Sequence, residues 1–361
     1  LPLLSIINLE LETHAREIYK GNLVDTSALA DQVLIYVSES DESEDPTPLQ
    51  WLDLLFWVPS ELRIGQTHVI LAADSTRVAF LRNLEGRRHG GGRFHATANS
   101  ILRDRQIEIE LDSFASTDNQ RVSRLEVDAE LVAPDIDSFI HLDGDVIATD
   151  ERAGYDFLVA GEYRDIRDFL QAFNAEGIIA GKLFLNARMR GDINGFTLSG
   201  MSLVIDNMPS YGFEAAGELS WDGEQSTIDL AASGELDSMA YLVDWIDLDL
   251  ADLGRAEAGL RLSGSLGKPF IEKFIVATSS DEDLNIVVTG QLDLRGPDAA
   301  SRQRNEIYVD AFAPTLTVLE RWLGKIPVDP GPWRASGAAA GILGDIQVNN
   351  LVLETGSHDT Y

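Results

Sequence analysis

The segment of this sequence that comes nearest to a catalytic signature is His89-Gly90-Gly91-Gly92. Some esterases use a similar glycine-rich loop as an oxyanion hole, in which backbone N–H groups stabilise a developing negative charge. That chemistry also needs a nucleophile, and the sequence contains no G-x-S-x-G elbow to present one. A glycine-rich hairpin turn is therefore the better interpretation of this segment.

The sequence also contains no clear metal-binding motif and no identifiable pair of catalytic carboxylates. None of the six histidines belongs to an H-E-x-x-H motif, and His89 with His95 is the only close pair, which favours surface or turn histidines. The aspartates between Asp244 and Asp252 lack the central glycine and closing glutamate of a calcium loop, so weak calcium binding stays open but solvated charges are favoured. The 60 acidic residues allow many glycosidase-like pairs and single out none.

Cofactor signatures are absent as well. The sequence has neither a G-x-x-x-x-G-K-[ST] phosphate loop nor a G-x-G-x-x-G motif that opens a helix. It has no cysteine, which excludes disulfides, thiol nucleophiles and cysteine-ligated metals. We therefore expect a protein that is not an enzyme, with no catalytic residues, no metal site and no cofactor.

The net charge of the chain limits the kinds of molecule it can bind. Its 361 residues include 28 Lys and Arg against 60 Asp and Glu, for a net charge of −32. Phosphate backbones repel such a protein, so nucleic acid is excluded as a partner. An anionic membrane surface repels it too, so contact with lipid should be apolar. No run of 18 apolar residues and no signal peptide occurs in the sequence.

An internal repeat organises the chain. Gly144, Gly217 and Gly290 lie in similar apolar-Gly-polar-apolar segments spaced 73 residues apart. A spacing of 77 residues separates Gly264 from Gly341, which indicates an insertion of about four residues near Arg295-Gly296-Pro297-Asp298. A fixed period of this kind is the signature of a repeat architecture.

Each repeat combines strands with one short helix. Apolar residues at i, i+3, i+4 and i+7 predict helical faces beginning at Ile166, Met239 and Leu316. Between these helices, apolar and polar residues alternate with period two, as in strands that have one apolar face. The fold class is therefore mainly β, with tandem repeats of antiparallel strands plus one short helix.

The repeats suggest a division of the chain. Residues 1–115 form an N-terminal β-rich region of diverged units, in which 58–64 and 106–111 are predicted strands and 38–46 is an acidic, solvated loop. Repeat 1 covers 116–179, repeat 2 covers 180–253, repeat 3 covers 254–333, and a truncated repeat 4 covers 334–361.

Three features resemble the AsmA-like family of Gram-negative envelope proteins, the bridge-like lipid-transfer proteins of the AsmA, TamB and YhdP type. They are the stretch from Val58 to Gly65, the Gly-x-Leu-x-Leu strands such as Gly181–Leu185 and Gly259–Leu262, and the Gly-x-Leu strand that precedes an apolar helical stripe, as in Gly234–Ile246. The likeness covers most of residues 55–356. This sequence lacks the N-terminal membrane helix of that family.

The resemblance implies a fold and a function. The repeats would form an elongated curled sheet whose apolar concave face is a groove that conducts phospholipid between the inner and outer membranes. The protein would lie in the periplasm, anchored in the inner membrane through a segment absent from this chain. Its partners would be phospholipid acyl chains and proteins of the two membranes.

The alternating strands supply candidate residues for this groove. They are Leu183, Leu185, Met189, Phe213, Leu219, Leu260, Leu262, Ile286, Val288 and Leu292. Periodicity alone is equally consistent with a closed core, as in a β-sandwich or closed solenoid. A structural or adhesive β-repeat domain is thus the alternative function, and a carbohydrate-active solenoid is the third. The resemblance is what favours the open groove.

Overall fold

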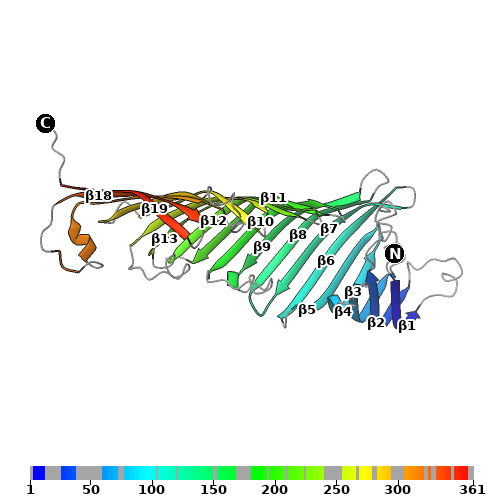
Figure 1. Ribbon diagram of the computed structural model, residues 1–361. Coiled ribbons are helices and arrows are strands. Elements are labelled where there is room, and N and C mark those ends of the chain that lie inside the picture. Colours follow the sequence, from blue (N-terminus) through cyan, green and yellow to red (C-terminus); the bar gives the residue numbers. More distant parts are fainter. Residues whose placement is uncertain are drawn as a thin grey trace. The chain divides into compact units, whose positions relative to one another are not determined.

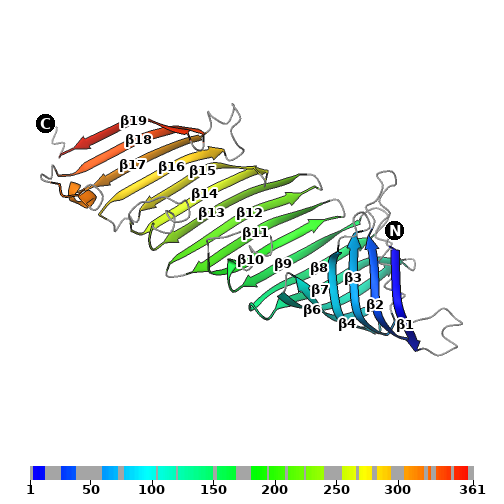
Figure 2. The ribbon, with the colours of Figure 1, turned by 60° about the horizontal axis from the view of Figure 1, so that its bottom comes forward.

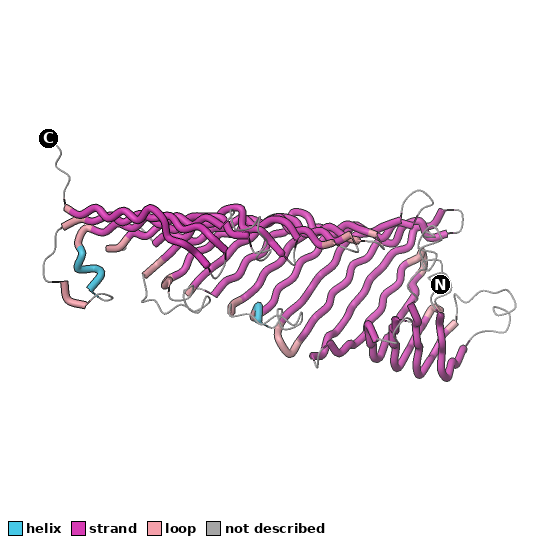
Figure 3. Tube along the Cα trace, in the orientation of Figure 1, coloured by secondary structure: helices cyan, strands magenta, loops and turns pink. Residues whose placement is uncertain are grey.

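A computed structural model gives the fold in segments. It describes residues 3–12, 26–37, 59–71, 77–102, 105–118, 121–148, 153–167, 180–192, 195–207, 210–222, 225–239, 254–265, 268–278, 283–293, 305–320, 324–326, 331–342 and 345–356. These residues are almost all β, and the 19 strands belong to one sheet (Figure 3). The mainly β fold predicted from the repeat is confirmed.

The chain divides into two compact units. Unit 1 comprises Leu1–Glu176 and Leu185–Phe196, and unit 2 comprises Gly177–Phe184 and Thr197–Tyr361. The strand β10 (Lys182–Gly191) contributes residues to both units.

Unit 1 is built from nine strands and most of β10 (Figure 1). The nine strands are β1 (Leu3–Glu12), β2 (Ser27–Val37), β3 (Glu61–Leu71), β4 (Arg77–His89), β5 (Arg93–Leu102), β6 (Arg105–Asp118), β7 (Arg121–Ala133), β8 (Ser138–Ala148) and β9 (Ala153–Tyr163). Each pairs antiparallel with the next, except that β2 and β3 are parallel.

Unit 2 contains the remaining strands, which lie side by side in chain order (Figure 2). They are β11 (Phe196–Asn207), β12 (Tyr211–Trp221), β13 (Ser226–Leu236), β14 (Ala256–Ser265), β15 (Lys268–Thr278), β16 (Asn285–Asp293), β17 (Asn305–Ala313), β18 (Trp333–Ile342) and β19 (Asp345–Thr355). From β12 to β19, each strand pairs antiparallel with the next.

Strand boundaries recur with the period of the sequence repeat. β8 and β12 begin at 138 and 211 and end at 148 and 221, so both ends are 73 residues apart. β9 and β13 are related in the same way. β14 and β18 are 77 residues apart at both ends. Four strands therefore separate equivalent positions, such as the start of β8 and the start of β12.

The repeated glycines have a steric cause. Gly144, Gly217 and Gly290 are paired with Phe157, Leu230 and Ile307, which are equivalent residues of the neighbouring strand. A Cβ at any of these glycines would lie less than 3.0 Å from a backbone oxygen of that strand, namely that of Asp156, Asp229 or Glu306. The strands can approach this closely only where the side chain is absent.

Small hydrophobic clusters close one end of the strands in unit 2. Tyr211, Leu236, Met239 and Ala256 form one cluster, and Leu284, Ala313 and Trp333 form the equivalent cluster of the next repeat. The 3-10 helix η3 (Leu316–Leu319), orange in Figure 1, packs on the second cluster. The Trp333 indole N–H donates to the Thr315 carbonyl at 3.0 Å. The residues of these clusters are buried, whereas many of the other strand residues of unit 2 are half-buried.

The structure adjusts some of the predicted elements. The segment predicted as a strand from Val58 begins only at Glu61, because Pro59 cannot donate to a strand ladder. The third predicted helix is a 3-10 turn over Leu316–Leu319. Ile166 starts a helical turn and Met239 lies in a turn, and both are buried at equivalent places. The remainder of the predicted helices, the acidic loop 38–46 and the aspartates from Asp244 lie outside the described residues.

Candidate functional site: an uncharged sheet face

Strand register gives unit 2 one face that is free of charge. From β12 to β17 the paired residues on this face are apolar, small or, at a few strand ends, uncharged polar. One row crossing the strands reads Gly234, Ala258, Val276, Val288 and Val309. We call this surface, on β12–β17, the apolar face of unit 2.

Most candidate groove residues come together on this face. Phe213, Leu219, Leu260, Leu262, Ile286, Val288 and Leu292 all point to it, as the register pairs show. Leu262, for example, pairs with Leu230 on one side and Ile271 on the other. These seven residues lie on β12, β14 and β16 and share one surface, and their role in a lipid groove stays a prediction.

The three candidates on β10 are placed differently. Leu183 belongs to unit 2 and is only 2% exposed, so it is a buried core residue like its repeat equivalents Ala256 and Trp333. Leu185 and Met189 belong to unit 1, where both are half-buried. Leu183 therefore has little surface to offer a ligand.

Exposure shows that the apolar face of unit 2 is only partly covered. Val288, Ile286 and Phe213 are half-buried, and Leu260 and Val309 are each 39% exposed. Every strand within the described ranges belongs to the one sheet, so no second sheet from those residues covers this face. The closed-sandwich arrangement is not found among them.

Unit 1 has an apolar face of the same kind. From Ile107 to Ala115 of β6, the apolar-side residues and their partners in β5, β7, β8 and β9 carry no charge. One row reads Ala98, Ile109, Leu131, Ile140 and Gly161. Alternation of side chains places the charged residues of these strands on the opposite face.

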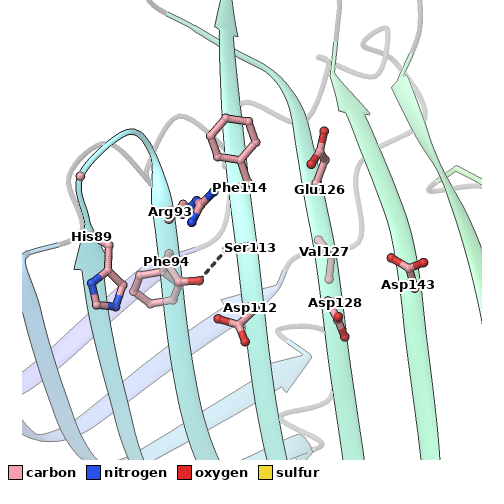
Figure 4. Close-up of a pocket in the computed structure, with 11 residues that line it drawn as sticks. His89, Arg93, Phe94, Asp112, Ser113, Phe114, Glu126, Val127, Asp128 and Asp143 are labelled. Atoms are coloured by element: carbon pink, nitrogen blue, oxygen red, sulfur yellow. Dashed lines mark hydrogen bonds between the residues drawn. The ribbon is translucent and has the colours of Figure 1, made fainter.

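That opposite face of unit 1 is acidic. Asp112, Asp128 and Asp143 are direct partners on three successive strands, β6 to β8. They line a hollow of about 670 Å³, which also receives His89 and Arg93 from the β4–β5 hairpin (Figure 4). Directly opposed like charges destabilise a sheet, so this row is an electrostatic cost within the fold.

The glycine-rich segment His89–Gly92 lies in the β4–β5 hairpin beside the acidic hollow. His89 ends β4 and Arg93 begins β5, with Gly91 and Gly92 at φ 79° and 84° in the turn between them. The hairpin interpretation is therefore confirmed. Positive φ angles of this kind are what glycine provides in a tight turn.

Arginines on the same side of unit 1 neutralise part of the charge. Asp156 accepts hydrogen bonds from Arg188 Nε at 2.6 Å and from Arg190 Nε at 3.0 Å. The hydrogen bond from Arg188 is the largest cause that lowers the pKa of Asp156 from 3.8 to about 2. Arg124 makes a two-pronged contact with Asp145, with both distances 2.8 Å.

Comparison with known proteins identifies no relative. The chain matches no protein-family model, no curated protein and no solved structure. Among the helices of the described residues, none has the length and apolar character needed to cross a bilayer.

Proposed function

We propose that the protein is a non-enzymatic lipid-binding scaffold whose apolar sheet faces hold the acyl chains of phospholipids and conduct them between the inner and outer membranes. The observation that carries this proposal is the apolar face of unit 2, which is uncharged over β12–β17 and half-exposed. A contiguous apolar surface of this kind marks an interaction site.

The energetics favour an apolar ligand on this face. Covering apolar surface contributes roughly 25 cal/mol per Å², so each 100 Å² buried under an acyl chain gives about 2.5 kcal/mol. Six strands spaced about 4.8 Å apart span about 24 Å of sheet, a distance over which an acyl chain keeps apolar contact. The absence of charge along the rows removes any fixed position for a headgroup, which favours sliding over tight binding.

The cellular location of the protein and its membrane partners are also part of the proposal. The sequence resemblance to AsmA-like proteins supports a periplasmic protein of a Gram-negative bacterium, anchored in the inner membrane and in contact with proteins of both membranes. Its charge of −32 supports apolar rather than electrostatic contact with anionic lipid. Nucleic acid is an unsuitable partner for the same reason.

Lipid extraction tests the proposal directly. The full chain is purified, its bound lipids are extracted and identified by mass spectrometry, and uptake of a fluorescent phospholipid from vesicles is measured. We expect copurified phospholipid and saturable uptake. Neither signal would appear if the protein were a structural or adhesive β-repeat, and turnover of polysaccharide without lipid uptake would favour the carbohydrate-active alternative.

A pair of adjacent substitutions locates the binding face. Val288 lies on the apolar face of unit 2, and Val287 points to the other side, where it is 38% exposed. We expect Val288→Asp to leave the fold intact, because its carboxylate reaches water on an open face, and to reduce lipid uptake at least about tenfold, since the desolvated charge opposes acyl contact. Val287→Asp should leave uptake unchanged.

The same pair separates the alternatives. In a closed core, Val288→Asp would leave an unpaired buried charge and lower the free energy of unfolding by several kcal/mol. A large loss of stability in Val288→Asp but not in Val287→Asp, measured by urea denaturation, would therefore contradict the open face and favour the structural role.

A further inference from the structure

The acidic face of unit 1 carries a group of side chains with mixed metal-ligand chemistry. His95 and Asp112 are direct partners on β5 and β6, and Glu110 lies two residues before Asp112 on the same side of its strand. Their ligand atoms all lie within 4.8 Å of one another. Within the part of the chain that the structure describes, no other group of three such side chains meets this condition.

The His95–Asp112 distance already fits a metal centre. Two donor atoms of a tetrahedral zinc shell with bonds of about 2.05 Å lie about 3.3 Å apart. The His95 Nδ1 to Asp112 Oδ1 distance is 3.1 Å. Glu110 is exposed, so its side chain can rotate to bring an oxygen to the same centre. Three protein ligands of this type leave a fourth position for water.

The surroundings place this group in a strongly negative field. Asp128 is the direct partner of Asp112, and Glu130 is the direct partner of Glu110. A second imidazole, that of His141, lies with its Nδ1 3.6 Å from Asp128 Oδ1. Imidazoles therefore flank the carboxylates on both sides, over four successive strands. A bound cation would offset the repulsion between the opposed carboxylates.

The ligand types select the class of cation. Calcium and magnesium prefer oxygen donors alone, whereas imidazole together with carboxylate suits zinc and similar divalent transition metals. We propose that His95, Glu110 and Asp112 form a binding site for a divalent transition-metal cation, with zinc the best match. The site lies on the face opposite the apolar face, so it stands independently of the proposed lipid binding.

Unit 2 provides a matched control. Glu235 and Glu257 are direct partners on β13 and β14 and line a hollow of about 510 Å³ with Asp206 and Glu214. No histidine lines that hollow. It therefore has the acidic character of the unit 1 site without an imidazole ligand, and it separates metal coordination from general attraction of cations.

Titration of the full chain with zinc chloride alone tests the site. After chelator treatment and dialysis, isothermal titration calorimetry should show saturable binding and the thermal midpoint should rise, because a ligand that binds the folded state stabilises it. His95→Ala should weaken zinc affinity by at least about tenfold. Asp112→Asn, which keeps the side-chain size, should weaken it similarly, and it serves as the second variant if His95→Ala fails to fold.

The controls decide between coordination and charge. Glu235→Gln with Glu257→Gln should leave zinc affinity unchanged, and magnesium should bind more weakly than zinc and without sensitivity to His95→Ala. Absence of saturable zinc binding would overturn the proposal. So would unchanged affinity in both His95→Ala and Asp112→Asn, or an equal loss in the double glutamine variant.

Discussion

Gly144, Gly217 and Gly290 each lie opposite a backbone oxygen that leaves no room for a Cβ. Their equivalence across the repeat is therefore a consequence of strand spacing rather than of turn formation, since all three lie inside strands. At this scale a single missing methyl group sets how closely two neighbouring strands pair.

The glycine requirement can be tested at Gly217. Gly217→Ala should lower the free energy of unfolding by about 2 kcal/mol, because the obstructing atom is a backbone oxygen that cannot move alone. Gly259→Ala is the control, since its Cβ would meet the terminal Ile275 Cγ2 at 3.3 Å, a side-chain atom that can give way. Urea denaturation measures both, and equal losses would contradict the steric explanation.

Protonation of Asp156 provides a second test. Hydrogen bonds from Arg188 and Arg190 hold its folded pKa at about 2, below 3.8. A lowered pKa contributes stability that is present above about pH 4 and is lost as the pH falls toward 2. Asp156→Asn should therefore be less stable than the unchanged chain at pH 6 and equally stable near pH 2. The contribution is modest, since the group is solvent-accessible.

Urea midpoints measured at both pH values check the Asp156 prediction. Arg188→Gln removes the larger hydrogen bond from the other side, so it should reduce the same pH-dependent difference. A difference between Asp156→Asn and the unchanged chain that persisted at pH 2 would show that packing, not charge, causes it.

At the scale of elements, each repeat closes one end of its strands with a small buried cluster. Tyr211, Leu236 and Ala256 in one repeat correspond to Leu284, Ala313 and Trp333 in the next. Large and small residues exchange places between the clusters, which is how cores tolerate substitution when total volume is kept. In unit 1, Ala30, Val33 and Ile64 form a further buried cluster.

Trp333 should carry much of the stability of its cluster. It is 5% exposed and donates its indole N–H to Thr315, so Trp333→Ala should cost about 3–5 kcal/mol. Trp221, which is 40% exposed, is the control, and Trp221→Ala should cost less than about 1 kcal/mol. Thermal and urea denaturation compare the two, and similar costs would contradict the assignment of the core to the cluster.

At the scale of the whole molecule, the charge of −32 opposes compaction. Self-repulsion destabilises a folded state, and salt screens it with a Debye length of about 8 Å at 0.15 M. We expect the thermal midpoint to rise when sodium chloride is increased from 10 mM to 300 mM, two concentrations chosen to span roughly 30 Å to under about 8 Å of screening. A fall over this range would show that attractive ion pairs dominate instead.

The sequence by itself determined the β class, the repeat period and which residues of each strand lie on its apolar side, such as Phe213, Leu219, Leu260 and Val288. Alternation with period two and glycines at a fixed interval can be read directly along the sequence, without knowledge of which strands are neighbours. The sequence did not show whether the apolar strand faces are exposed or form a buried core, because alternating apolar residues occur in both arrangements.

Tertiary structure decided which alternating residues are covered. Leu183 and Leu262 have the same pattern in sequence, yet Leu183 is buried and Leu262 is half-buried on the apolar face. It also decided that His95 meets Glu110 and Asp112, and that β2 pairs parallel with β3. Partners on neighbouring strands depend on register, which long-range pairing sets and local spacing does not encode.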